Sequence, residues 1–182
     1  MFYTGNGDKG VSQLSSSCSV PKSDPAMGVL GSLDELNSLL GLVRNKKIST
    51  QAKKELRNVQ EKLFIIQAYC AYAMMKMQAR APKISAAEIT RVEKAIDTME
   101  KKVNPGKHFI IPGATEGSAY LDYARALCRR VEREMIILAS KKKCYRSPTI
   151  LTYLNRLSSL FYALARFEVK QSGKKENKPK YK

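Results

Sequence analysis

The stretch VLGSLDELNSLLGLV, residues 29–43, repeats its apolar side chains in steps of three and four, at Val29, Leu33, Leu36, Leu40 and Val43. This spacing places the apolar side chains on one stripe of an α-helix and the polar side chains on its other faces. A helix of this kind is stable in water only when other elements cover its stripe. The stretch therefore predicts one helix of a packed helical protein.

Four further helices are predicted downstream by the same spacing, over residues 56–77, 85–103, 115–138 and 147–173. Ser85 and Glu88 have the spacing of a capping box, and Ser147 followed by Pro148 suits the start of a helix. Apart from residues 109–111, no segment shows the two-residue alternation of a strand. Because the connections are short, the predicted fold class is an all-α, five-helix bundle.

Composition divides the chain into three segments. Residues 1–27 are rich in glycine, serine, proline and aspartate and have no helical period, so an N-terminal loop segment is expected. Residues 28–173 form the helical domain. Residues 174–182, KKENKPKYK, carry five lysines and one glutamate after Gly173. They predict a disordered basic tail that can be removed without loss of activity.

The strong positive charge of the chain raises the question of a nucleic-acid partner. The formal net charge is +17, from 33 basic and 16 acidic residues, and the tail contributes +4 of it (five lysines minus one glutamate). Clustered lysines and arginines bind phosphates, but charge alone describes solubility and nonspecific attraction. No RNA-binding aromatic signature or zinc-finger spacing accompanies the charge. No specific nucleic acid is therefore expected as a partner.

Several other classes of protein are disfavoured by composition. The four cysteines lie far apart and His108 is the one histidine, so a protein-bound metal is not expected. No run of about 18 uninterrupted apolar residues predicts a membrane span. The first residues also lack a signal-peptide pattern. We therefore expect a cytoplasmic protein without a membrane partner.

The first candidate binding segment is TGNGDKG, residues 4–10. Three glycines in seven residues allow backbone N–H groups to turn toward an anion, and Lys9 and Lys22 add positive charge. The segment lacks the spacing of a P-loop. It predicts either a phosphate-binding loop or a plain flexible N-terminus.

The second candidate is ARALCRRVER, residues 124–133, on the fourth predicted helix. Arg125 and Arg129 share a face with Glu132, and two further arginines lie on a neighbouring stripe. Arginines this close repel one another unless an anion neutralises them, and a planar guanidinium matches phosphate oxygens in pairs. The alternative is a solvated basic face.

Three further segments carry polar or aromatic side chains, namely DELNS at 34–38, HFIIPG at 108–113 and YLNRLS at 153–158. In the last of them, Asn155 and Ser158 line one polar stripe with Tyr162, although asparagine disfavours a helix interior. Taken singly, each segment is also explained by a solvated helix face or a buried connecting loop.

Taken in order, the five segments resemble the PduO-type ATP:cob(I)alamin adenosyltransferases from Thr4 to about Glu168. The family pattern contains T-x-T-G-D-x-G, a lysine before an acidic residue, G-x-x-D-E-L-N-S, F-x-x-P-G, A-R-x-x-C-R-R-x-E-R and Y-L-N-R-L-S. The chain is similar to it at Thr4–Gly10, Lys22 with Asp24, Gly31–Ser38, Phe109–Gly113, Ala124–Arg133 and Tyr153–Ser158. The ordered set is far more specific than any single fragment.

The resemblance implies a ferritin-like bundle, assembled as a homotrimer with active sites between subunits, that transfers the 5′-deoxyadenosyl group of ATP to the cobalt of a corrinoid. It implies binding of ATP, with Mg²⁺ on the phosphates, by Thr4, Gly5, Asn6, Gly7, Ser12, Gln13, Lys22, Arg129, Arg130, Val131, Glu132, Arg133 and Asn155. It implies corrinoid binding by Phe109, Asp34, Arg125 and Tyr162, and catalytic roles for Arg129, Asp34 and Arg125. A corrinoid reductase and an adenosylcobalamin-dependent enzyme are the implied partners.

The chain departs from the family pattern at several positions. Asn6 replaces a threonine, and the arginine expected shortly before Lys22 is missing. Asp122 and Tyr123 stand where a histidine is common, and Ser159 replaces an aspartate. Two other functions therefore stay open, a non-catalytic ATP- or cobalamin-binding protein of this family and a basic helical protein that binds nucleic acid.

Overall fold

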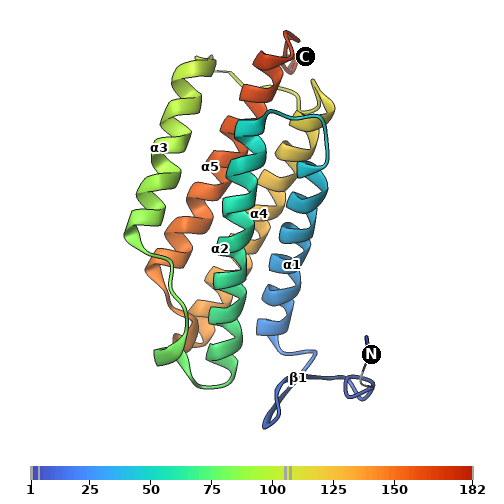
Figure 1. The fold of residues 1–182 in the computed structure, drawn as a ribbon, viewed down its shortest axis with the longest axis vertical. Coiled ribbons are helices and arrows are strands. Elements are labelled where there is room, and N and C mark those ends of the chain that lie inside the picture. Colours follow the sequence, from blue (N-terminus) through green and yellow to red (C-terminus); the bar gives the residue numbers. More distant parts are fainter. Residues whose placement is uncertain (1, 4, 105, 107, 182) are drawn as a thin grey trace.

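Five helices run side by side along the long axis of the molecule, and a small β-hairpin lies at one end (Figure 1). The structure is a computed structural model that describes residues 2–3, 5–104, 106 and 108–181. The helices are α1 (Pro25–Arg44), α2 (Thr50–Met74), α3 (Ala86–Val103), α4 (Glu116–Lys141) and α5 (Pro148–Gln171). The predicted five-helix bundle is therefore confirmed, with the hairpin as an addition.

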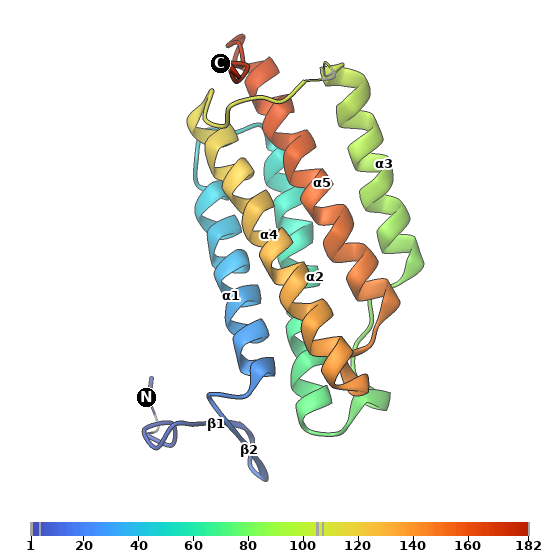
Figure 2. The same ribbon diagram turned by 180° about the vertical axis from the view of Figure 1, so that it is seen from behind.

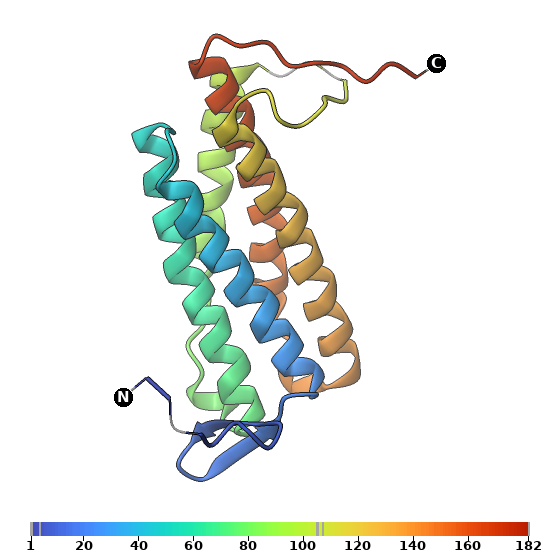
Figure 3. The ribbon, with the colours of Figure 1, turned by 90° about the vertical axis from the view of Figure 1, so that its right-hand side faces the viewer.

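The core lies between α5 and the helices packed around it. α5 packs on α3 and α4, while α1 packs on α2 and α4 (Figure 2 and Figure 3). The C-terminal half of α5 contains an unbroken run of buried residues, Ala163–Val169. A helix buried on all sides needs a partner for every polar side chain that it carries. Glu168 in this run accepts hydrogen bonds from the hydroxyl and the backbone N–H of Ser49, at the start of α2.

Side-chain caps fix the starts of the helices. Ser85 caps α3 and Ser147 caps α5, as the sequence predicts. Asp24 caps α1, so this helix begins at Pro25, before the stretch that predicted it. The Asp24 carboxylate also accepts a hydrogen bond of 2.8 Å from Lys142 Nζ, which ties the start of α1 to the residue after α4.

The N-terminal segment contains two strands that the sequence did not predict. β1 (Val11–Ser15) pairs antiparallel with β2 (Cys18–Pro21), with Ser12 opposite Val20. Both strands are short and rich in serine, so they show little of the apolar alternation that identifies a strand. Residues 109–111, the one stretch with some strand alternation, lie in a loop.

The second helix is shorter than predicted, because it ends at Met74 rather than near Met77. Lys76 adopts the left-handed backbone conformation, with φ of 58°. The N–H of Met77 then bonds to the carbonyl of Tyr72, which closes the helix in the manner of a Schellman motif. Apolar spacing alone does not reveal such a stop at a lysine.

Within the described residues, α1 is the one helix whose length and mean hydropathy of 1.2 would also suit a membrane span. Its apolar stripe is buried, and the helix packs on α2 and α4. The same composition suits a core helix, and in this bundle α1 is a core helix.

Part of the C-terminal tail lies against the bundle. Glu176 Oε1 is 2.6 Å from Nε of Arg166, and the carbonyl of Asn177 accepts a hydrogen bond of 2.8 Å from the N–H of Ile111. These contacts differ from the expectation of a tail that is disordered from residue 174 onward. The division of the chain at residues 27 and 173 stays a prediction.

Candidate functional site

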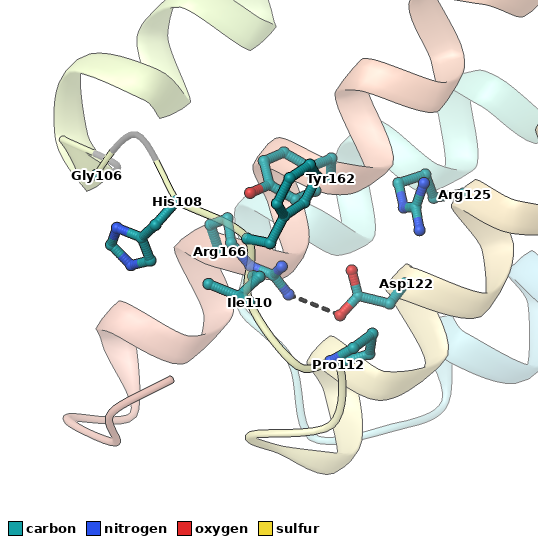
Figure 4. A pocket seen from close by; sticks show the side chains of 9 residues that line it. Gly106, His108, Ile110, Pro112, Asp122, Arg125, Tyr162 and Arg166 are labelled. Atoms are coloured by element: carbon teal, nitrogen blue, oxygen red, sulfur yellow. Dashed lines mark hydrogen bonds and ion pairs between the residues drawn. The ribbon is translucent and has the colours of Figure 1, made fainter. Parts of the chain in front are cut away.

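A hollow opens at the end of the bundle where the chain crosses from α3 to α4 (Figure 4). We call it the loop hollow. Its volume is about 520 Å³, and it is lined by Gly106, His108, Phe109, Ile110, Pro112, Asp122, Arg125, Tyr162 and Arg166. A second hollow of about 400 Å³, the helix hollow, lies beside it and shares Arg125, Tyr162 and Arg166. The two hollows therefore meet at these three side chains.

The loop hollow has an exposed aromatic ring at its edge. Phe109 is 79% exposed, so a large apolar surface faces solvent where a ligand or another chain can cover it. The turn between Phe109 and α4 is fixed by Pro112, which restricts the backbone, and by Gly113, whose φ of 105° few L side chains adopt. The sequence thus builds a stiff turn behind an exposed ring.

The wall of the loop hollow contains a buried charge cluster, which we call the Arg166 cluster: Asp122, Arg166 and Glu176. Arg166 is only 4% exposed, and its Nη2 donates a hydrogen bond of 2.6 Å to Asp122 Oδ2 (Figure 4). Its Nε lies at ion-pair distance, 2.6 Å, from Glu176 Oε1. The guanidinium also lies 4.9 Å from the ring centre of Tyr162. Two carboxylates and an aromatic ring thus offset a charge that would be strongly unfavourable if buried alone, although Nε and Nη1 of Arg166 make no hydrogen bond among the described residues.

Arg125 and Arg129 lie one turn apart on α4 and line the helix hollow. In the described part of the chain, neither guanidinium has a carboxylate partner, and Arg125 Nε is buried without a hydrogen bond. Asp34 is exposed on α1 and makes no ion pair with Arg125 among these residues. Two arginines at the hollow therefore remain available for an anion or for a carboxylate from another chain.

Other predicted ATP-binding residues on α4 already have partners within the chain. Arg130 donates to Glu35 on α1 and lies 4.0 Å from Glu134. Glu132 accepts a hydrogen bond of 2.8 Å from Asn155 Nδ2 on α5. The structure thus brings Glu132 and Asn155 together, and their role in binding ATP stays a prediction.

One predicted ATP-binding residue differs from the expectation, and one residue outside the prediction joins the polar stripe. Val131 is buried in the core, because the helical turn directs it away from Arg130 and Glu132, so its side chain is not at this surface. Arg156 donates a hydrogen bond of 2.8 Å to Asn155 Oδ1, and it pairs with Glu93 at 2.7 Å. Arg156 is therefore coupled to the polar stripe of α5. Arg133, by contrast, is exposed.

The glycine-rich N-terminal segment folds into turns beside the Lys22 ammonium group. Gly5 and Gly10 have φ of 73° and 75°, where L side chains are strained. Lys22 Nζ donates a hydrogen bond of 2.9 Å to the carbonyl of Gly7. A Cβ on Gly7 would lie 3.1 Å from Lys22 Nζ, so glycine allows this close approach. The arrangement holds a positive charge against a compact backbone loop.

The remaining N-terminal candidates lie in or next to the hairpin. Ser12 and Gln13 are on β1, and Asn6 Nδ2 donates to Gln13 Oε1 at 2.5 Å. Thr4 lies outside the described residues. The hairpin is at the end of the bundle opposite the loop hollow and beyond the first turn of α1 (Figure 3). Within one chain, these residues are therefore not brought to Arg129, which lies in the middle of α4.

Comparison with known proteins decides the family. The family model for cobalamin adenosyltransferases matches residues 2–168. The chain belongs to the cobalamin adenosyltransferase family. It is 37% identical over 167 residues to the corrinoid adenosyltransferase PduO of Citrobacter freundii, which covers 92% of this chain and 49% of that protein. This chain therefore spans about half the length of the PduO relatives. A second corrinoid adenosyltransferase of Citrobacter freundii is 32% identical and is matched over 94% of its length.

Solved structures of the family share the fold. A variant of the PduO-type ATP:corrinoid adenosyltransferase from Lactobacillus reuteri, complexed with cobalamin and ATP, has a TM-score of 0.89 at 28% identity. The match covers 100% of this chain and 97% of that one. Another variant of that type, complexed with ATP, has a TM-score of 0.86 at 28% identity, with coverage of 98% and 99%.

In this cobalamin adenosyltransferase family member, two groups of predicted site residues lie at opposite ends of the bundle, while Asp34, Arg130, Glu132, Arg133 and Asn155 belong to neither. Phe109, Arg125, Arg129 and Tyr162 surround the two hollows, and the N-terminal group lies at the other end of the bundle. The Arg166 cluster was not predicted from the sequence. A signal was present, because Arg166 lies four residues after Tyr162 and so continues the polar stripe of Asn155, Ser158 and Tyr162 along α5.

Proposed function

We propose that the chain transfers the 5′-deoxyadenosyl group of ATP to the cobalt of cob(I)alamin or another corrinoid, giving adenosylcobalamin and triphosphate. The observation that carries this proposal is the loop hollow, where the exposed Phe109 ring lies with Arg125, a guanidinium without an acid partner in the described chain. An apolar edge beside available positive charge suits a large, mostly apolar ligand with polar groups at its rim. Family membership, and relatives complexed with cobalamin and ATP, support the same reading.

The reaction requires positioning and charge stabilisation more than acid–base chemistry. Cobalt(I) is a strong nucleophile, and its electron pair forms the cobalt–carbon bond to C5′. The C5′–oxygen bond breaks at the same time, and the triphosphate leaves with those electrons. Because negative charge grows on the leaving group, fixed cations beside it lower the barrier. The corrinoid itself supplies the unusual reactivity.

For the ATP side of the site, we assign the N-terminal segment and the middle of α4. Arg129, Arg133 and Lys22 are exposed, and the Lys22 ammonium group lies beside the glycine turns, so all three can reach phosphate oxygens. The Glu132–Asn155 pair offers fixed polar groups to the nucleoside. Mg²⁺ is expected to arrive with the nucleotide, since it retains phosphate and water ligands when it binds to proteins.

For the assembly, we propose a homotrimer with active sites between subunits. The hairpin and the middle of α4 are separated within one chain, so a neighbouring chain would bring them together. Asp34 and Arg125, which do not pair within the chain, would form an ion pair across the same interface. We further propose a cytoplasmic location, with a corrinoid reductase and an adenosylcobalamin-dependent enzyme as partners.

For the corrinoid side, we assign Phe109 to the lower face of the cobalt, with Tyr162 as a second aromatic residue that lines the same hollow. A lower axial ligand stabilises oxidised cobalt, so a hydrophobic ring that excludes water favours four-coordinate cobalt(II). Four-coordinate cobalt(II) is easier to reduce, because the removal of an axial ligand raises the reduction potential.

The direct test is an anaerobic assay of the protein with cob(I)alamin and MgATP, followed by its visible spectrum. We expect the spectrum of adenosylcobalamin to appear and an equal amount of triphosphate to be released. Binding of both ligands without turnover would instead identify a non-catalytic member of the family. Salt-dependent binding of oligonucleotides of any sequence, again without turnover, would identify a nucleic-acid-binding protein.

A further inference from the structure

We propose that residues 174–177 form a C-terminal strap that positions the loop carrying Phe109, with Glu176 as the positioning residue. The strap is defined by one ion pair to α5 and one hydrogen bond to the loop. Its consequence for cobalt chemistry rests on the proposed function, whereas the contacts themselves do not.

The anchor of the strap is the ion pair between Glu176 and Arg166. Glu176 is the one acidic residue in a tail with five lysines, residues 174–182. Its carboxylate points to the buried guanidinium, while the described lysines of the tail, Lys174, Lys175, Lys178 and Lys180, are exposed. The tail thus directs its negative charge inward and its positive charges to solvent, the arrangement that favours binding to a buried arginine.

Arg166 does not depend on Glu176 for its own burial. Its Nη2 already donates to Asp122, and the Tyr162 ring covers the guanidinium. The Glu176 side chain is 23% exposed, so it can leave the pair and become hydrated. Loss of Glu176 therefore still leaves Arg166 paired with the Asp122 carboxylate. The Glu176–Arg166 ion pair therefore holds the tail against α5, while Asp122 remains the partner of Arg166 within the bundle.

The residue after the anchor reaches the loop. The carbonyl of Asn177 accepts a hydrogen bond of 2.8 Å from the N–H of Ile111, two residues after Phe109. Between residues 108 and 113, this is the single hydrogen bond that the described structure contains. A loop with one such bond opens easily once the bond is lost. The strap therefore sets where Phe109 sits over the loop hollow.

Amide hydrogen exchange tests the strap without reference to activity. We expect the Ile111 N–H to exchange about tenfold faster in Glu176→Ala and in a chain that ends at Gly173. Glu176→Gln, which keeps the shape but removes the charge, should behave like Glu176→Ala. The matched control is Lys175→Ala, since Lys175 is the exposed neighbour of the anchor. Unchanged exchange in the Glu176 variants, with the fold intact by circular dichroism, overturns the proposal.

The electron paramagnetic resonance spectrum of bound cob(II)alamin with ATP tests the effect on Phe109. Glu176→Ala should lose at least half of the four-coordinate cobalt(II) signal while the Kd for ATP stays within about twofold. Faster exchange of Ile111 with an undiminished four-coordinate signal would show that the strap does not position Phe109. If the parent protein binds no cob(II)alamin at all, the proposed function fails, and the exchange data alone then decide whether the strap exists.

Discussion

Arg129 and Arg130 are adjacent in sequence but have different electrostatic surroundings. Arg130 is held by Glu35 and Glu134, so its charge is partly neutralised within the chain. Arg129 lines the helix hollow and, among the described residues, has no carboxylate partner. A guanidinium without a partner retains its full attraction for a phosphate oxygen. Of the two, Arg129 is therefore the better candidate for stabilising the leaving triphosphate.

Arg129→Ala should lower kcat/KM about 100-fold or more, because removing one donor to a developing oxyanion has an effect of this size. The matched control is Arg57→Ala, which removes an exposed arginine of α2 whose contact is an ion pair with Glu61. Its kcat/KM should be unchanged. Arg156→Ala is a poor control, since Arg156 donates to Asn155. Equal losses in folded Arg129→Ala and Arg57→Ala would place the phosphate site elsewhere.

Phe109→Ala should slow the reaction that starts from cob(II)alamin far more than transfer from pre-reduced cob(I)alamin. The exposed ring has no core to stabilise, so its removal should leave the fold and the affinity for ATP nearly unchanged. Water could then reach the lower face of cobalt(II) and stabilise the oxidised metal. We would measure the four-coordinate population by electron paramagnetic resonance, with Phe64→Ala on α2 as an exposed-phenylalanine control. If Phe109→Ala shows as large a four-coordinate cobalt(II) population as the parent protein, Phe109 has no role at the lower face of the cobalt.

At the scale of an element, the start of α1 depends on Asp24. Its carboxylate accepts hydrogen bonds from Lys142 Nζ and from the N–H of Ala26, each at 2.8 Å. The bond from Lys142, followed by that from Ala26, lowers the pKa of Asp24 below its ordinary value. A lowered folded-state pKa means that these contacts stabilise the fold at neutral pH. That contribution is lost as the pH falls below about 4.

Asp24→Ala should lower the free energy of unfolding by about 1 kcal/mol at pH 7, the usual effect of losing an N-cap. Asp24→Asn retains an acceptor for Ala26 and should lose less. Urea unfolding at pH 7 and pH 3 would measure both effects, because the difference between parent and Asp24→Ala should shrink at pH 3. A difference that is the same at both pH values would show that the carboxylate charge has no part in it.

The helices were predictable because apolar spacing and caps are local signals. Ser85 and Ser147 mark the start of α3 and α5 in the sequence, and the structure places caps there. The strands of the hairpin and the end of α2 at Met74 were not predictable in this way. The strands are too short and polar to show a period, and the left-handed Lys76 belongs to a residue type with no preference for that conformation.

For the molecule as a whole, the sequence indicated the residues of the site but not which of them meet. Motif order identified Phe109, Arg125 and Arg129, and these line the hollows. The tail, by contrast, was predicted to be disordered from its charge, because composition does not show that Glu176 lies against Arg166. Arg166 and Glu176 are close in the chain, but they meet only because the chain turns back on itself after α5 ends at Gln171, and such a turn is set by tertiary packing.

A site shared between subunits can be tested by mixing two inactive chains. In the proposed homotrimer, Lys22 from one subunit and Arg129 from the next complete each ATP site. Lys22→Ala and Arg129→Ala chains, co-expressed with different tags, would then form mixed trimers in which some interfaces carry both intact residues. With random assembly about one quarter of the interfaces are intact, so activity should return to about one quarter of the parent value. Each variant alone, shown by size-exclusion chromatography to be a trimer, supplies the baseline. If both residues served a site within one chain, no mixed trimer would contain an intact site, and activity would stay at the mean of the two baselines.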